Sequence, residues 1–354
     1  MNKLNKYIFR KQVMRGAIIS LTLFTGISVL MEPEIILSPL TLKESSIDIE
    51  TERLLGEVEL LTGIETNNNK NLVLLHAVLN NKNLTESEKK YFYNLKDIIC
   101  ENKYIDLVDS YDRLFNLTVI YTKRPGYYDD TVIAIYDNTN NKIIVFENED
   151  KFNEEIFEHE LIHALFTNKT NIKLPKFFLE GVTELLTNEY FSENTYVENK
   201  TYPFEIAIVK ILCEMIGSDE ILKTYTTGNT ETFYDKLSEF NQDGEKFIKN
   251  LDTIYKAFSR NKEIPTDEYN EAIVFMDNFY KNKYSGDLEK QETYNYYKKI
   301  INMIHLEKPF DEYQKYIYEN GVFVKPYFSE KLKEKSTNNL NSDNYKKMLK
   351  KSHK

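Results

Sequence analysis

Apolar residues recur at helical spacing over most of the chain. Over residues 42–104 the pattern predicts helices, and the sequence Thr85-Glu86-Ser87-Glu88 is typical of a capping box that opens one of them. Helical spacing returns after Tyr202, and Gly217 is placed to end the first helix of that part. The helices predicted there span 203–216, 219–226, 230–240, 244–259, 267–283, 288–305 and 310–319.

Between these two parts the pattern changes to that of strands. Residues 117–122, LTVIYT, form a short β-branched run, and 131–137 and 142–148 flank the turn NTNN as a β-hairpin would. Two further helices follow, EDKFNEEIFEHELIHALF and, after Pro175, KFFLEGVTELLTNEY. The pattern therefore predicts an α+β fold that is mostly α-helical, with a small β-sheet or hairpin packed on the first of these two helices.

The amino end of the chain combines charge with an apolar segment. Five cations and no acid precede residues 17–31, AIISLTLFTGISVLM, which carry no charge. This arrangement is typical of an export signal, and the apolar segment is shorter than the roughly 20 residues of a stable membrane-spanning helix. A buried amphipathic helix is the alternative, but the segment has no polar face. We expect residues 1–31 to be a signal peptide or short membrane anchor, with the rest of the chain extracellular.

Composition narrows the class of protein. With 41% hydrophobic and 13% aromatic residues the chain is not a disordered one, and its net charge of -10 argues against binding to nucleic acid. Cys100 and Cys213 are too few for a disulfide-rich scaffold or for a zinc site with four thiolate ligands. The sequence leaves open whether these two cysteines pair.

One segment carries residues suited to catalysis. His159-Glu160-Leu161-Ile162-His163 is H-E-x-x-H within a predicted helix, and residues four apart lie on one helical face, so both imidazoles can bind the same ion. Glu160, one position further round the helix, can serve as general base toward water at that ion. The alternative is a helix with ordinary surface histidines, and the residues that follow argue against it.

The next predicted helix offers a third ligand. Glu180 can supply a carboxylate, and Gly181 would leave room for the backbones of the two helices to approach. Glu184, one turn further, is placed to accept the second ring N–H of a ligand histidine. Apolar neighbours predict that this helix is buried, and a buried acid needs a partner such as a metal ion. Glu184 as the ligand in place of Glu180 is the alternative.

These segments, HELIHALF followed by LPKFFLEGVTELL, resemble the gluzincin zinc metallopeptidases, specifically the peptidase MA-like group. The resemblance covers about residues 117–217 and implies a gluzincin-like catalytic core with a helical C-terminal region. It implies Zn²⁺ bound by His159, His163 and Glu180, with Glu160 as base and proton shuttle. It also implies that an edge strand before the H-E-x-x-H helix holds an extended peptide by main-chain pairing.

The chain departs from better-known branches of that group. Leu179 stands where thermolysin-like and aminopeptidase-like members have Asn, and Lys169 occupies the position of the third histidine of a metzincin. A tyrosine or histidine usually stabilises the oxyanion in such sites. Tyr190, Tyr202 and His305 are the candidates, and the sequence assigns this role to none of them.

These observations divide the chain into five expected regions. They are a signal peptide or anchor (1–31), an N-terminal helical region (42–115), a metallopeptidase-like core (116–202), a C-terminal helical region (203–329) and a basic flexible tail (330–354).

We expect a secreted or surface-anchored zinc-dependent endopeptidase that hydrolyses peptide bonds with zinc-activated water and Glu160 as general base. Its partners would be peptide or protein substrates, without nucleic acid, and the membrane only through the N-terminal segment. The alternative is a non-catalytic exported interaction protein whose zinc site is structural or vestigial. The long helical C-terminal region favours that alternative, whereas Glu160 argues against it because a structural zinc site needs no base.

Overall fold

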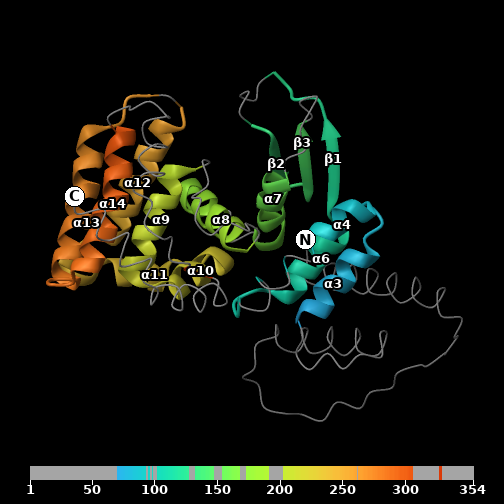
Figure 1. Cartoon of the computed structure of the whole chain (residues 1–354), viewed down its shortest axis with the longest axis horizontal. Helices are drawn as coiled ribbons and strands as arrows, with labels where there is room; N and C mark the ends of the chain where they lie inside the picture. The colour runs from blue at the N-terminus through green and yellow to red at the C-terminus, as the bar shows by residue number, and fades with distance from the viewer. Residues whose placement is uncertain are drawn as a thin grey trace, which may run out of the picture.

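The computed structural model describes residues 70–92, 95, 98, 102–126, 132–146, 154–167, 173–190, 202–260, 262–305 and 327–328. These residues form an α+β structure that is mostly helical and includes a small mixed sheet of three strands. Two helices, α7 (Glu154–Phe166) and α8 (Lys176–Tyr190), link its two sides. In Figure 1 the sheet and the amino-terminal helices lie on one side of this pair, and the later helices lie on the other.

The first described helices are α3 (Lys70–Asn80) and α4 (Glu86–Phe92). The capping box predicted before α4 is confirmed, because the Thr85 N–H donates to Glu88 Oε2 at 2.6 Å and the Glu88 N–H donates to Thr85 Oγ1 at 3.3 Å. Each of these two residues thus satisfies a backbone N–H of the other, as the sequence implied.

The helix α6 (Leu107–Asn116) falls almost wholly in the helical region predicted over 42–115, although no separate helix was predicted there. Asp106 caps this helix by accepting a hydrogen bond from the Asp109 N–H at 3.0 Å. Tyr111 and Leu114 are buried on its inner face. An aspartate ahead of apolar residues three and four apart was the available signal, and the helix packs beside α7.

The three strands are β1 (Thr118–Thr122), β2 (Ala134–Asp137) and β3 (Lys142–Phe146). Their order is β1-β3-β2, with β1 parallel and β2 antiparallel to β3. The predicted hairpin is confirmed, and its turn ends at Asn141, which adopts a left-handed φ of 53° that asparagine tolerates well. Consequently β2 is an edge strand of the described sheet, and it packs against α7.

Six helices follow the pair α7 and α8. They are α9 (Pro203–Ile216), α10 (Ser218–Thr227), α11 (Glu231–Leu237), α12 (Gly244–Phe258), α13 (Thr266–Lys283) and α14 (Leu288–His305). The predicted stop at Gly217 is confirmed, since its φ of 95° suits glycine and separates α9 from α10. Residues 204–216 are all buried, so α9 forms the centre of this half, between α8 and α14.

Some predictions differ from the structure or lie beyond what it describes. The helix expected over 230–240 ends at Leu237, and a short 3₁₀ turn, Glu239–Asn241, follows it. The expected helices before residue 70 and at 310–319, the amino-terminal segment and the basic tail lie outside the described residues. Among the helices that are described, none combines the length and apolar character needed to cross a membrane. The division into five regions stays a prediction.

Candidate metal centre

The helix α7 carries the H-E-x-x-H sequence and is held from several sides. Leu161, Ile162 and Leu165 are fully buried, and the helix packs on α6, α8, β2 and β3. At its carboxyl end the Ser110 hydroxyl and the Arg113 guanidinium of α6 both donate to the Leu165 carbonyl oxygen, at 3.2 and 2.6 Å. They satisfy a carbonyl in the last turn, where intrahelical donors run out, and thereby anchor α7 against α6.

The helix α8 brings the second set of side chains and contacts α9 closely at Gly181. A Cβ on Gly181 would lie 2.6 Å from the Glu205 carbonyl oxygen and 2.7 Å from Val209 Cγ2. We expected Gly181 to admit the backbone of the H-E-x-x-H helix, and that expectation was wrong, because the close neighbour is α9. Consecutive helical residues point about 100° apart, so Glu180 can face α7 while Gly181 faces α9.

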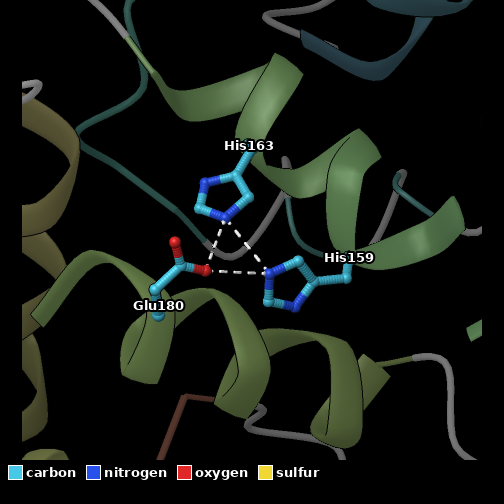
Figure 2. A group of neighbouring side chains, drawn as sticks. All are labelled: His159, His163 and Glu180. Carbon is cyan, nitrogen blue, oxygen red and sulfur yellow. Dashed lines mark hydrogen bonds and ion pairs between the residues drawn. The ribbon is translucent and has the colours of Figure 1, made fainter. Parts of the chain in front are cut away.

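Three side chains converge between α7 and α8. Figure 2 shows His159 and His163 directed from α7 toward Glu180 on α8. Glu180 Oε2 lies 3.3 Å from His159 Nε2 and 3.2 Å from His163 Nε2, and the two Nε2 atoms are 3.1 Å apart. Zinc bonds of about 2.0–2.1 Å in a tetrahedron place neighbouring ligand atoms about 3.3–3.4 Å apart. The spacing fits such an ion closely, so these residues could hold a metal.

Glu184 lies on the opposite side of the His159 ring. The His159 Nδ1–H donates to Glu184 Oε2 at 2.7 Å, and both side chains are nearly inaccessible to solvent. A carboxylate at Nδ1 leaves the Nε2 lone pair directed at the point where the three donors meet. Glu180 therefore belongs to the three side chains that converge between α7 and α8, whereas Glu184 contacts only His159 of these three and orients its ring.

His163 is supported differently, by residues that the sequence analysis missed. Its Nδ1 lies 3.4 Å from Thr183 Oγ1, which in turn lies 2.6 Å from the hydroxyl of Tyr225 on α10. Thr183 and Tyr225 are 0% and 1% exposed. Thr183 follows Glu180 by three positions and so shares its face of α8, a spacing that could have suggested it. Tyr225 had no such signal, because only the packing of α10 on α8 brings it near.

Glu160 lies beside this group and contacts the sheet. Glu160 is only 7% exposed, and the backbone N–H of Tyr136 on β2 lies near enough to its carboxylate to favour the ionised form. The structure thus brings Glu160 and the edge strand β2 next to the three side chains that could hold a metal.

Burial and the mutual attraction of these groups determine their charges. Burial raises the pKa of Glu160, and attraction to the two imidazoles offsets this only in part. Burial also opposes ionisation of Glu180, but attraction to His163 and hydrogen bonds with both imidazoles lower its pKa. Burial disfavours a charged His159, yet hydrogen bonds to Glu180 and Glu184 raise its pKa. Glu180 is therefore an ionised carboxylate within a buried cluster, able to bind a metal ion.

Tyr202 is the oxyanion candidate that the structure places against the group. Its ring stacks on His159, with centroids 5.3 Å apart and planes at 10°. Its backbone is left-handed, with φ 55° and ψ 43°, which is uncommon for a residue other than glycine. Tyr190 instead donates its hydroxyl to the Phe328 carbonyl at 3.2 Å, and His305 stacks on a tyrosine of α13.

No family model, curated protein or solved structure matched this chain when each set was compared with it. What the structure shows is a buried group of two histidines and a glutamate that could hold a metal ion. Any function of this group is inferred from the residues themselves.

Proposed function

We propose that the protein is a zinc-dependent endopeptidase acting on peptide or protein substrates. The main support is that His159 Nε2, His163 Nε2 and Glu180 Oε2 converge, at distances from one another that suit the ligands of a tetrahedral ion. Two imidazoles and one carboxylate form a common catalytic zinc set, and three protein ligands leave the fourth position open. A zinc ion there would supply Lewis-acid chemistry, polarising the peptide carbonyl and making water more acidic.

Glu160 has the position of the general base in this proposal. It follows the ligand His159 directly and is buried beside the three donors, where it can take a proton from the attacking water. The same carboxyl group would then give that proton to the amine that leaves when the peptide bond breaks. A site with a structural metal has no use for this carboxylate, and that distinction favours an enzyme.

The edge strand β2 supports a peptide as the substrate. The Phe146 N–H donates to the Ile133 carbonyl at 2.8 Å, and Ile135 lies opposite Ile144. In antiparallel sheets, hydrogen-bonded pairs alternate with pairs that exchange no hydrogen bonds. Ile133 and Ile135 belong to the first kind, so the N–H and C=O groups of Ala134 and Tyr136, which belong to the second, point away from β3. The Tyr136 N–H lies near Glu160 in that direction, so this edge of β2 runs beside the proposed base. An extended peptide paired there would lie next to the three donors.

The test is peptide cleavage by purified full-length protein. The wild type is incubated with a peptide library, with and without a zinc chelator, and products are read by mass spectrometry. Glu160→Gln is expected to retain zinc while losing nearly all cleavage. Glu158→Gln is the matched control, because both acids are 7% exposed on the same helix and Glu158 is not assigned to the site. Unchanged cleavage by Glu160→Gln refutes the mechanism, and stoichiometric zinc without any cleavage by the wild type favours the non-catalytic alternative.

We also propose that the protein acts outside the cell, secreted or anchored to the outer face of the membrane. The support is the sequence alone, namely five cations followed by the uncharged residues 17–31. Fractionation of expressing cells, with sequencing of the mature amino terminus, tests this proposal. Activity confined to the cytosol with an intact amino terminus refutes it.

A further inference from the structure

The two ligand histidines are supported by groups of different chemistry. His159 Nδ1 faces the Glu184 carboxylate at 2.7 Å, whereas His163 Nδ1 faces the Thr183 hydroxyl, which is paired with the Tyr225 hydroxyl. An ionised carboxylate only accepts hydrogen bonds, so Glu184 suits one ring tautomer of its neutral histidine. A hydroxyl donates or accepts according to the rotation of its O–H, so Thr183 suits either tautomer of His163.

The tautomer of His163 should depend on whether a metal is bound. The His163 Nε2 and Glu180 Oε2 atoms are 3.2 Å apart, so in protein stripped of metal a proton on Nε2 would let His163 donate to that carboxylate. Nδ1 then accepts from the Thr183 O–H, and Thr183 accepts from Tyr225. With Nε2 bound to a metal, Nδ1 carries the proton and donates to Thr183, whose own O–H donates to the Tyr225 oxygen.

We propose that Thr183 and Tyr225 form a hydroxyl pair that holds the His163 ring in one position with or without the metal, by reversing both of its hydrogen bonds. The heavy atoms need not move, because each O–H turns about its own C–O bond. Packing keeps the pair in place: both residues are at most 1% exposed, and the Tyr225 ring packs on Phe166 of α7 at a centroid distance of 5.5 Å. The two residues are thus positioning residues for the zinc site. This inference rests on the proposed metal site and is independent of peptidase activity.

The first test measures zinc affinity in full-length protein by competition with a chromophoric chelator. Tyr225→Phe keeps the ring but leaves the Thr183 O–H without its acceptor in the zinc-bound state, and Thr183→Val leaves the His163 Nδ1–H without one. Each variant is expected to bind zinc about 10- to 100-fold more weakly, and Thr183→Ser to bind near the wild-type value. Thr224→Val is the matched control, because among the described residues its buried hydroxyl has no hydrogen-bond partner, and the affinity should stay unchanged.

The second test reads the tautomer directly. Long-range ¹H–¹⁵N spectra of histidine-labelled protein are recorded at about pH 8, above the ordinary imidazole pKa, with His163→Gln to assign the signal. The wild type is expected to carry the His163 proton on Nε2 when metal-free and on Nδ1 with zinc. The same tautomer in both states, or unchanged zinc affinity in Tyr225→Phe and Thr183→Val, overturns the proposal while leaving the zinc site intact. No zinc binding by the wild type overturns both.

Discussion

The contact between α8 and α9 at Gly181 leads to a prediction about both stability and metal binding. A methyl group added by Gly181→Ala would meet the Glu205 carbonyl oxygen at 2.6 Å and Val209 Cγ2 at 2.7 Å. The valine side chain has some freedom to rotate, but the carbonyl belongs to the α9 backbone. The substitution therefore has to push the two helices apart, and the residue next to it is Glu180.

The expected magnitude follows from these distances. Ordinary contacts begin at 3.4 Å, so α8 and α9 have to separate by roughly 0.8 Å at this point. Overpacking of this kind costs about 1–3 kcal/mol, and the better helix propensity of alanine offsets about 1 kcal/mol of it. The difference is about 0–2 kcal/mol. Because a backbone oxygen cannot rotate out of the way, we expect the upper half of this range, so metal-free Gly181→Ala should unfold with a free energy about 1–2 kcal/mol lower than that of the wild type.

Urea denaturation of metal-free protein, followed by circular dichroism, measures this difference. Gly126→Ala is the matched control, because a Cβ there has no neighbour within 4 Å in the part of the chain that the structure describes. Its unfolding free energy should change by no more than about 0.5 kcal/mol. We also expect Gly181→Ala to bind zinc more weakly, since Glu180 shifts away from the two imidazoles. A Gly181→Ala protein as stable as the wild type, or more stable, would refute the reasoning, because helix propensity would then outweigh the contact with α9.

Three further predictions concern the surroundings of the proposed metal ligands. Glu184→Gln removes the charge that faces His159 Nδ1, so zinc affinity measured by chelator competition should fall about 10-fold or more, and equal affinity would contradict the role of that hydrogen bond. Tyr202→Phe should keep the stack on His159 and the zinc affinity, whereas Tyr202→Ala should weaken zinc binding; equal affinities in both variants would contradict a role for the stack. Burial raises the pKa of Glu205 to about 8 from its ordinary 4.5, so the folded state holds a proton that the unfolded state has lost between these values. The stability of metal-free protein should therefore fall as pH rises from about 4.5 to 8. Glu205→Gln should flatten that fall in urea titrations, and an unchanged slope would contradict the burial of this acid.

Much of the local structure followed from the sequence because it depends on residues near one another in the chain. The capping box at Thr85 and the turn before β3, where Asp137 accepts from two backbone N–H groups, are set by side-chain-to-backbone hydrogen bonds over a few positions. The four-residue spacing of His159 and His163 places both rings on one face of any helix that contains them. The α+β class and the boundaries of α9 followed in the same way from periodicity and from Gly217. The helix α6 was missed as a separate element, although Asp106 and the apolar residues Leu107, Tyr111 and Leu114, spaced four and three apart, were a signal for it.

Contacts between elements were decided by the tertiary structure. Glu180 and Glu184 were both eligible as ligands from their spacing, and the packing of α8 on α7 brings Glu180 to the Nε2 atoms and Glu184 to Nδ1 of His159. The same packing turns Gly181 toward α9, contrary to our expectation, and Tyr225 reaches Thr183 from α10, 42 positions along the chain. Periodicity specifies which face of a helix a residue occupies, but not which other element covers that face. For this protein the sequence by itself determined the pair of histidines and the glutamate beside them, and only the folded arrangement of α7, α8, α9 and α10 decided which residues complete and support that group.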